Sequence, residues 1–305
     1  MPLPFQHLVS TKQLSREDTD AILAVAAKME RVMEAGGSDL LAGKILAALF
    51  YEPSTRTRLS FESAMHRLGG KVVSAVGMQF SSLYKGETVQ DTINVIGQYV
   101  DIIAMRHPEQ GSAEQAASVS PVPFINGGDG PGEHPTQGLL DLYTIQKERG
   151  ALDGAHIAMV GDLKYGRTVH SLALLMSLYK DVRFTFIAPK ELPMPEKVIK
   201  VLKGKGIPYI ETHELEEGLQ ADCIYMTRVQ KERFENPEEY ERLKLKYVLQ
   251  AKHVQSRAIT VMHPLPRVGE IATDVDPLPN AAYFRQARNG VPVRMALLAM
   301  LLRKA

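Results

Sequence analysis

The chain has 305 residues, more than one compact core usually holds, so its length predicts two domains. A net charge of +1 excludes a global basic field for nucleic acid or an anionic membrane, and any anion site must be built locally. The single cysteine, Cys223, excludes an internal disulfide and a paired-cysteine zinc site. Without a signal-like start or an apolar run of about 18 residues, we expect a cytoplasmic protein.

Apolar strand patterns alternate with amphipathic helix patterns in the first part of the chain. Residues 44–52 are typical of a buried strand, and residues 56–70 of a helix that ends at glycine. Further strands are predicted at 71–76, 101–106 and 121–126, with helices at 87–99 and 112–120. This order predicts a parallel sheet with helices on both faces.

A loop rich in glycine and proline at 126–135 interrupts the alternation, and a long helix is predicted at 134–150. Strands and helices then alternate again, and the apolar stretch 289–305 predicts a terminal helix packed between other elements. The predicted fold class is therefore α/β, with two doubly wound parallel-sheet domains joined by two interdomain helices. The predicted parts are domains 1–133 and 151–284, the interdomain helix 134–150, and a C-terminal helix, 285–305, packing back on the first domain.

The segment 50–62 places hydroxyl and guanidinium groups where a buried strand passes into a helix. Its central residues are Ser54, Thr55, Arg56 and Thr57. The first turn of a helix has unpaired N–H groups and the positive end of the helix dipole, so this segment predicts a phosphate site. The alternative is a simple Ser/Thr cap with surface arginines. Two hydroxyl–arginine pairs directly after a buried strand favour the phosphate site.

Other polar residues in the first half carry weaker signals. Lys85, in the loop 81–88, reads on its own as a solvated lysine. Arg106 ends a buried strand and is equally consistent with a structural role. His134 and Gln137 share one face of a helix start, where they suit a carbonyl oxygen and an amino group. The alternative for this pair is a capping histidine and a solvated glutamine, but their position at the domain break favours a site.

The second half has basic residues after strands but no dinucleotide fingerprint. Gly161 and Gly166 lack the Gly-x-Gly-x-x-Gly spacing, and the next strand is not followed by an acidic residue for a ribose. Arg167, at a helix start, is better interpreted as a ligand for a carboxylate. Arg228 and Gln230 follow another predicted strand.

A proline-rich segment follows the last predicted strand. Pro264 and Pro266 flank Leu265 and stiffen the backbone there. Such a segment either presents backbone carbonyls at fixed positions or serves only as a rigid connection.

Taken together and in this order, the motifs resemble the aspartate/ornithine transcarbamoylase family over essentially the whole chain. They are STRTR, SxxxKGET, MRHPEQG, HPTQ, GDLKYGRTVHSL, TRVQKER and HPLPR. The ornithine branch carries cysteine in an HCLP segment, where this chain reads HPLP at 263–266. Aspartate needs cations for two carboxylates, so Arg167 and Arg228 favour the aspartate branch.

The resemblance implies carbamoyl transfer from carbamoyl phosphate to L-aspartate, giving N-carbamoyl-L-aspartate and phosphate in pyrimidine nucleotide biosynthesis. It implies no metal and no organic cofactor. Two alternatives stay open: a carbamoyltransferase for another amine, such as ornithine, and a non-catalytic homologue that acts as an assembly scaffold.

The resemblance also implies a carbamoyl phosphate site. The residues that hold the phosphate are Ser54, Thr55, Arg56, Thr57 and Arg106. Those that face the carbamoyl carbonyl oxygen are Thr57, Arg106 and His134, which form the catalytic set with Arg56. Those around the carbamoyl amino group are Gln137, Pro264, Leu265 and Pro266. Pro264 and Leu265 contribute their backbone carbonyls.

For aspartate, the resemblance implies that Arg167 binds the α-carboxylate and that Arg228, oriented by Gln230, binds the β-carboxylate. Ser81 and Lys85 match a loop that a neighbouring subunit lends to the site, and Lys85 also belongs to the aspartate set. A homotrimer with shared sites would then be the smallest active unit. A separate zinc-bearing regulatory chain stays open as a partner, and neither nucleic acid nor a membrane is expected.

Overall fold

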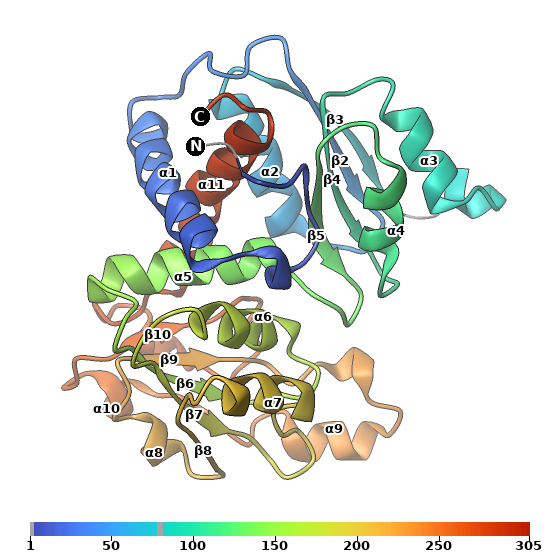
Figure 1. Ribbon diagram of the computed structural model, residues 1–305. Helices are drawn as coiled ribbons and strands as arrows, with labels where there is room; N and C mark the ends of the chain where they lie inside the picture. Colours follow the sequence, from blue (N-terminus) through green and yellow to red (C-terminus); the bar gives the residue numbers. More distant parts are fainter. Residues whose placement is uncertain (1–2, 78–81) are drawn as a thin grey trace. The chain divides into compact units, whose positions relative to one another are not determined.

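The computed structural model describes residues 3–77 and 82–305, apart from the side chain of Glu232 (Figure 1). The chain forms two compact units. Unit 1 comprises Met1–Leu140 and Arg288–Ala305, and unit 2 comprises Asp141–Ala287. Within the described residues, each unit contains one five-stranded parallel sheet with helices between the strands, which confirms the predicted α/β class.

The sheet of unit 1 has the strand order β1-β5-β4-β2-β3. Its strands are β1 (His7–Leu8), β2 (Ile45–Phe50), β3 (Lys71–Val76), β4 (Ile102–His107) and β5 (Phe124–Asp129). Its helices are α1 (Arg16–Glu34), α2 (Thr55–Arg67), α3 (Val89–Ile96) and α4 (Ser112–Val119), with 3-10 turns η1 (Thr11–Gln13) and η3 (Ser82–Lys85). Helix α2 covers one face of this sheet, and α3 and α4 cover the other (Figure 1).

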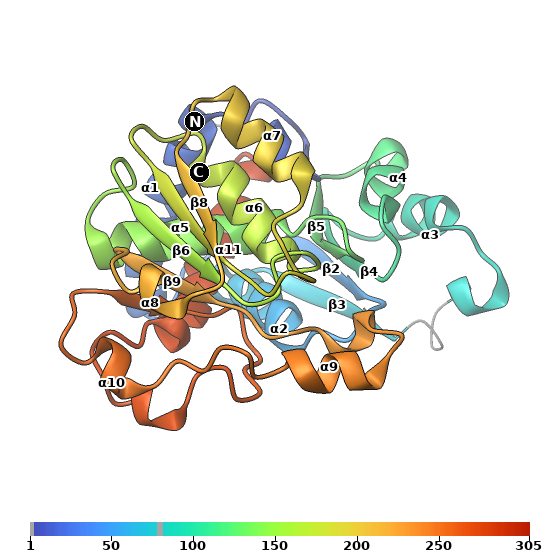
Figure 2. The same ribbon diagram turned by 90° about the horizontal axis from the view of Figure 1, so that it is seen from below.

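The sheet of unit 2 has the strand order β10-β9-β6-β7-β8. Its strands are β6 (His156–Val160), β7 (Arg183–Ile187), β8 (Tyr209–Thr212), β9 (Cys223–Met226) and β10 (Thr260–Met262). Its helices are α6 (Arg167–Met176), α7 (Glu196–Gly204), α8 (Leu215–Gly218), α9 (Pro237–Leu243) and α10 (Ala251–Val254), with 3-10 turns η4 (Lys231–Arg233) and η5 (Thr273–Val275). Helices α6 and α7 lie over one face of the sheet, and α8 and α10 lie over the other (Figure 2).

Two helices belong partly to each unit. Helix α5 (Pro135–Arg149) contains the division after Leu140, and helix α11 (Tyr283–Leu301) contains the division before Arg288. The predicted terminal helix is present, and its residues from Val293 to Met300 are almost entirely buried. This burial explains why apolar residues occur all round it. No helix in the described part of the chain has the length and apolar character needed to cross a membrane.

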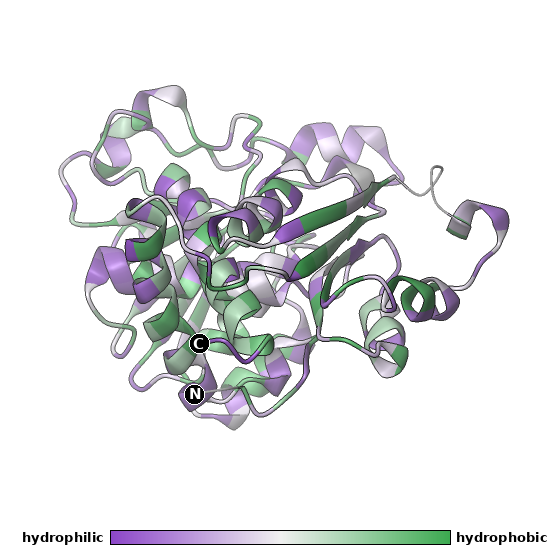
Figure 3. Ribbon diagram, turned by 90° about the horizontal axis from the view of Figure 1, so that it is seen from above, coloured by the Kyte–Doolittle hydropathy of each residue, from purple (hydrophilic) through white to green (hydrophobic). Residues whose placement is uncertain are grey.

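The strands are apolar because helices cover both faces of each sheet. Strand β2, with the sequence ILAALF, is buried from Leu46 to Phe50. Figure 3 shows the strands coloured as hydrophobic over most of their length, whereas the helices alternate between the two colours. Strand β3 is an exception because it lies at the edge of its sheet, where Val73 and Val76 are exposed.

The structure differs from the sequence prediction at the Gly/Pro-rich loop. Strand β5 continues to Asp129, inside the segment predicted as a loop. The first of its two glycines, Gly127, is compatible with a strand because the backbone of β4 approaches closely: a Cβ on Gly127 would lie 3.1 Å from the carbonyl oxygen of Met105. Close packing therefore explains Gly127, and a φ of +120° explains Gly128.

Candidate active site

The phosphate motif of unit 1 lies where β2 passes into α2. Ser54 is the N-cap residue of α2, but its side chain makes no capping hydrogen bond. Arg56 is exposed in the first helical turn, whereas Thr57 is buried. The next arginine, Arg58, is paired with Glu62 at 3.2 Å. This geometry weighs against a simple serine cap and leaves the first turn of α2 as a place where an anion meets backbone N–H groups.

Arg106 reaches the same edge of the sheet from the neighbouring strand. It is aligned with Phe50, the last residue of β2, and its carbonyl accepts a hydrogen bond from the backbone N–H of Tyr51. One guanidinium nitrogen, Nη2, lies 2.6 Å from Oε2 of Glu52, and the Arg106 side chain is 12% exposed. Glu52 therefore holds this guanidinium beside the phosphate motif, and a bound anion would compete with that carboxylate.

His134 and Gln137 lie at the start of α5, after the end of β5. The carbonyl of His134 accepts hydrogen bonds from the backbone N–H groups of Gln137 and Gly138, and His134 is 3% exposed. Its Nδ1 atom lies 3.4 Å from the Thr136 hydroxyl, which accepts a hydrogen bond of 3.1 Å from Nη2 of buried Arg294. The hydroxyl accepts from Arg294 and keeps its own proton, which it can donate to Nδ1 of a neutral ring that carries its proton on Nε2.

Three neighbouring parallel strands thus bring most of the unit 1 residues to one edge. These residues lie after β2, near the end of β4 and at the start of α5: Ser54, Thr55, Arg56, Thr57, Arg106, His134 and Gln137. Lys85 is different, because it is exposed in η3, beyond the edge strand β3. Ser81 lies outside the described residues.

In unit 2, one buried carboxylate joins the two loops that carry Arg167, Arg228 and Gln230. Arg167 is the first residue of α6, and Arg228 follows β9, the neighbour of β6. Asp162 is fully buried, and its carboxylate accepts hydrogen bonds from the backbone N–H groups of Tyr165 at 2.9 Å and Gln230 at 3.3 Å. It therefore ties together the two loops that carry the arginines. Burial raises the pKa of Asp162, although backbone hydrogen bonds and the charge of Arg228 oppose this.

The segment 264–266 follows β10, which is the other neighbour of β9. The Leu265 amide donates a hydrogen bond of 2.7 Å to Nδ1 of His263. The unit 2 residues therefore also gather at one edge, at the carboxyl ends of β6, β9 and β10. In α/β folds this is the edge where ligands bind.

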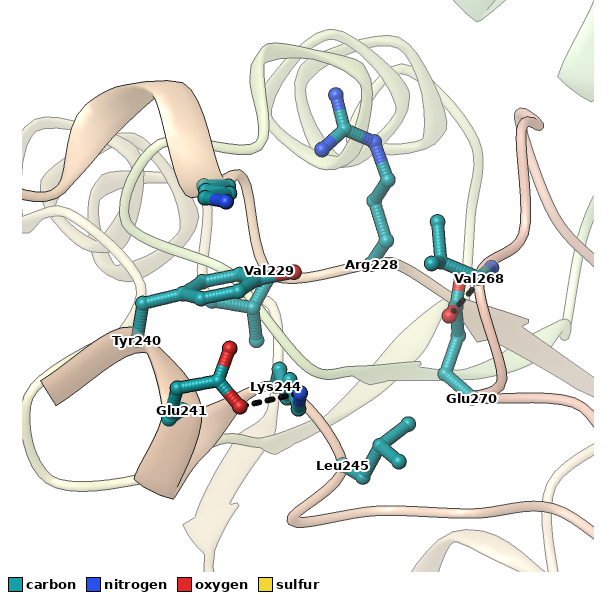
Figure 4. Close-up of a pocket in the computed structure, with 9 residues that line it drawn as sticks. Arg228, Val229, Tyr240, Glu241, Lys244, Leu245, Val268 and Glu270 are labelled. Carbon is teal, nitrogen blue, oxygen red and sulfur yellow. Dashed lines mark hydrogen bonds and ion pairs between the residues drawn. The ribbon is translucent and has the colours of Figure 1, made fainter. Parts of the chain in front are cut away.

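A pocket of about 220 Å³ opens beside Arg228 (Figure 4). The residues that line it are Arg228, Val229, Lys231, Tyr240, Glu241, Lys244, Leu245, Val268 and Glu270. Lys244 pairs with Glu241, and the Arg228 guanidinium extends away from that pair in Figure 4. The pocket wall thus mixes cations with carboxylates, which suits a small charged ligand better than an apolar one.

Comparison with known proteins identifies the family. The carbamoyl-P binding domain of aspartate/ornithine carbamoyltransferase matches residues 6–147, and the Asp/Orn binding domain matches residues 153–301. The chain belongs to the aspartate/ornithine carbamoyltransferase family. The family resemblance predicted from the motifs is therefore confirmed.

Members of this family named for aspartate are similar over nearly the full length. The aspartate carbamoyltransferase catalytic subunit of Methanocaldococcus jannaschii is 52% identical over 299 residues, which are 97% of this chain and 98% of the relative. The catalytic subunit of Methanopyrus kandleri is 50% identical over 299 residues, with coverage of 97% and 96%.

Solved structures of the same carbamoyltransferase family have the same fold. The catalytic subunit of M. jannaschii aspartate transcarbamoylase has a TM-score of 0.92 at 50% identity, covering 99% of this chain and 100% of that one. Aspartate transcarbamoylase from Trypanosoma cruzi, in complex with N-(phosphonacetyl)-L-aspartic acid, has a TM-score of 0.90 at 44% identity, with coverage of 96% and 94%.

Sequence reasoning missed the residues that support the candidate site, all of them buried or half-buried. They are Glu52, Thr136, Asp162, Glu270 and Arg294. Arg294 left one usable signal, because it is a charged residue in the otherwise apolar C-terminal part of its helix, residues 290–301. Asp162 lies within the motif GDLKYGRTVHSL, in which only the glycines and Arg167 carried a predicted role.

Proposed function

We propose that the chain is an aspartate carbamoyltransferase, which transfers the carbamoyl group of carbamoyl phosphate to the amino group of L-aspartate. The products are N-carbamoyl-L-aspartate and phosphate. Relatives named for this activity, about half identical over nearly the whole chain, support the proposal. The observation that carries the choice of amine is the pair of arginine-bearing loops, 163–167 and 228–230, joined through buried Asp162. Two guanidinium groups suit a dicarboxylate, and ornithine would supply only one carboxylate.

In unit 1, the first turn of α2 binds the phosphate of carbamoyl phosphate. Ser54, Thr55 and Thr57 offer hydroxyl and backbone donors, and Arg56 offers a guanidinium group that is exposed in that turn. Arg106 completes the phosphate site when its guanidinium exchanges part of its contact with Glu52 for the anion.

The carbamoyl carbonyl oxygen becomes negative when the amine of aspartate attacks. Thr57, Arg106 and His134 stabilise this charge as preorganised donors. In other acyl-transfer enzymes, one donor of this kind stabilises the transition state by about 3–4 kcal/mol. A neutral His134 ring with its proton on Nε2 is sufficient as a donor, and the Thr136 hydroxyl beside Nδ1 favours that tautomer. The departing phosphate accepts the proton of the amine, so no protein base is required.

The carbamoyl amino group is bound by the Gln137 side chain and by the backbone carbonyls of Pro264 and Leu265, with Pro266 at the border of the site. Fixing the carbonyl carbon next to the attacking amine removes much of the entropic cost of a reaction between two molecules.

In unit 2, Arg167 binds the α-carboxylate of aspartate and Arg228 binds the β-carboxylate. The backbone bond from Gln230 to Asp162 orients the loop of Arg228. Both substrates are anions, and their mutual repulsion in a water-poor site would amount to several kcal/mol without these cations.

The finer proposal for assembly is a homotrimer whose neighbouring subunits lend Ser81 and Lys85 to each site. Exposed Lys85 and Tyr84, together with the exposed edge strand β3, support an interface between subunits. Mixing an Arg56→Ala chain with a Lys85→Ala chain should restore activity, because some sites in mixed trimers receive both intact residues.

A mixture of Arg56→Ala and Arg228→Ala chains is the matched control. It should stay inactive, because Arg56 and Arg228 of any one site belong to the same chain, so every site lacks one of the two arginines. Absence of recovery in the first mixture, with mixed trimers demonstrated by mass, would refute subunit sharing.

We further place the reaction in pyrimidine nucleotide biosynthesis in the cytoplasm, where the buried, unpaired thiol of Cys223 remains reduced. The relatives are named catalytic subunits, which supports a separate regulatory chain as a partner, and the family resemblance leads us to expect that this chain bears zinc. The mass and zinc content of the assembly purified from its source cells test this partner.

The activity itself is tested by colorimetric detection of carbamoyl aspartate with purified chain, carbamoyl phosphate and aspartate. Ornithine at the same concentration is the matched comparison. We expect product with aspartate and none with ornithine. Product with ornithine alone would refute the proposal, and a folded chain inactive with both amines would favour the scaffold alternative.

A further inference from the structure

Leu265 has a backbone conformation that requires support from its surroundings. Its φ is +55°, in the left-handed region that side chains with a Cβ rarely adopt. Such a residue keeps this conformation only where neighbouring groups impose it, and these positions cluster at ligand sites. The supporting groups should therefore be visible around residues 263–270.

The first support is the imidazole of His263, which is 1% exposed. Its Nδ1 atom accepts the hydrogen bond of 2.7 Å from the Leu265 N–H. Because Nδ1 accepts, the proton of the neutral ring lies on Nε2, which donates to Oε1 of Glu270 at 2.6 Å. Burial lowers the pKa of His263, in keeping with a neutral ring.

The second support is the Glu270 carboxylate, which belongs to a residue 3% exposed. Its other oxygen, Oε2, accepts a hydrogen bond of 2.9 Å from the Val268 N–H. Burial alone would raise the pKa of Glu270, but the bonds from His263 and Val268 lower it below its ordinary value. One buried acid therefore ties down both ends of the segment 265–268, through the imidazole at one end and directly at the other.

This pair is part of a larger buried network in unit 2. The His263 N–H donates to the Gln286 side chain at 2.9 Å, and Gln286 donates to Asp141 at 2.7 Å. Tyr225 donates to the second oxygen of Asp141 at 2.8 Å. Networks in which the buried partners satisfy one another hold a segment rigidly.

We propose that His263 and Glu270 are positioning residues for the carbamoyl group: Glu270 fixes the His263 tautomer, and Nδ1 of that ring fixes the Leu265 amide. The carbonyls of Pro264 and Leu265 are thereby aimed at the carbamoyl amino group. This inference rests on the proposed function, since it assigns that segment to carbamoyl phosphate. It adds two buried side chains that do not touch the substrate but determine how its amino group is recognised.

Three variants separate positioning from general stability. Glu270→Gln leaves only one acceptor oxygen for two donors, Val268 N–H and the His263 ring. His263→Phe removes the acceptor of the Leu265 amide altogether. His263→Asn retains such an acceptor, because an asparagine oxygen bonds the N–H two residues later in an Asx turn.

The control is Asp222→Asn. Asp222 also accepts two hydrogen bonds, from Arg149 at 3.0 Å and from the His156 N–H at 2.8 Å. It precedes β9, at the opposite edge of the same sheet from residues 263–270. Its loss should lower the melting temperature without changing ligand recognition.

The readout is the ratio of two affinities, for carbamoyl phosphate and for inorganic phosphate, which lacks the amino group. We expect Glu270→Gln and His263→Phe to weaken carbamoyl phosphate binding roughly tenfold to a hundredfold and phosphate binding little. His263→Asn should recover most of the ratio. If His263→Phe does not fold, Glu270→Gln and His263→Asn still give opposite predictions.

Equal weakening of both ligands, or the same ratio in Glu270→Gln, His263→Asn and wild type, would overturn the positioning role. A change of the ratio in Asp222→Asn would overturn it as well. Failure of the proposed function gives another result: the wild-type chain itself would not prefer carbamoyl phosphate to phosphate and would form no carbamoyl aspartate.

Discussion

The two units each place a buried histidine beside the candidate site, and the groups behind these histidines differ. In unit 1, Nδ1 of His134 lies beside the Thr136 hydroxyl, which accepts a hydrogen bond from Arg294. Behind His263 in unit 2 lies the carboxylate of Glu270. The Thr136 hydroxyl lies beside Nδ1 of His134, whereas the Glu270 carboxylate accepts the Nε2 proton of His263 and leaves Nδ1 to accept the Leu265 N–H.

The same contrast extends to the cations of the site. Unit 1 places Arg56 at a helix start, and it places Arg106 near a strand end, where the guanidinium pairs with Glu52. Unit 2 places its arginines on two loops whose backbone N–H groups donate hydrogen bonds to the buried carboxylate of Asp162. In the proposed phosphate half, in unit 1, the helix start itself presents Arg56. In the proposed carboxylate half, in unit 2, the loops of both arginines are joined by a hydrogen bond between Asp162 and Gln230, residues 68 positions apart.

The largest effect is expected from Arg56→Ala, which removes the cation from the helix start in unit 1. The ratio kcat/KM for carbamoyl phosphate should fall roughly a thousandfold, because a charged donor and its dipole-assisted site act together on the phosphate. Steady-state kinetics measure it. Arg58→Ala is the matched control, since Arg58 lies on the same helix but pairs with Glu62. An equal loss of kcat/KM in Arg56→Ala and Arg58→Ala would contradict the proposal that the helix start presents Arg56 to the phosphate.

A smaller and more selective effect is expected from Arg228→Ala in unit 2. The KM for aspartate should rise roughly a hundredfold while the affinity for carbamoyl phosphate changes little, since the lost charge-assisted bonds serve one carboxylate. Arg242→Ala is the control, because that arginine is exposed and pairs with Glu191. An unchanged aspartate response in Arg228→Ala would show that this assignment is wrong.

The support of His134 is tested by Thr136→Val, with Thr136→Ser as the variant that keeps the hydroxyl. The valine should lower kcat roughly tenfold, because the hydroxyl that favours the Nε2-protonated ring is lost. Nitrogen NMR of the labelled imidazole should report a changed tautomer for His134 in the valine variant alone. Identical kcat values and spectra for the two variants would remove Thr136 from the account.

The smallest effect concerns stability in weak acid. Burial lowers the pKa of His107 in unit 1 and of His156 and His263 in unit 2 below the ordinary value of 6.5. Below pH 6.5 the unfolded chain binds protons that the folded chain does not, so stability falls as pH falls. Each histidine contributes at most about 1.4 kcal/mol per pH unit. Asp162 opposes this trend at lower pH, because burial raises its pKa.

We therefore expect a lower melting temperature at pH 5.5 than at pH 7.5. His263→Asn should reduce the difference, because it removes one of these titrating groups. A higher melting temperature at pH 5.5 than at pH 7.5 would contradict the neutral state of these histidines.

Local sequence patterns were sufficient for the alternating strands and helices and for the motif at Ser54–Thr57, because a strand followed by a helix start is contiguous. They did not predict α1, although Ser15 and Asp18 form a capping box at its start. They also missed β1, whose two residues form a strand only by pairing with β5. A pairing of this kind leaves no local periodicity.

The pairings of the support residues could not be predicted for the same reason. The bond between Asp162 and Gln230 joins residues 68 positions apart, and the bond between Thr136 and Arg294 joins residues 158 positions apart. Periodicity is read in windows of about 11–18 residues, so these pairs are visible only in the folded chain. The family resemblance identified the residues proposed to contact substrate, but not the groups that hold them.

The central claim, that cations of both units serve one pair of anionic substrates, is tested most directly with N-(phosphonacetyl)-L-aspartate, which joins both anionic parts. Calorimetric titration of wild type, Arg56→Ala, Arg228→Ala and the double variant gives the affinity of each. We predict tight binding to wild type and a large loss in each single variant. Binding to Arg228→Ala as tight as to wild type, with loss only in Arg56→Ala, would contradict the claim.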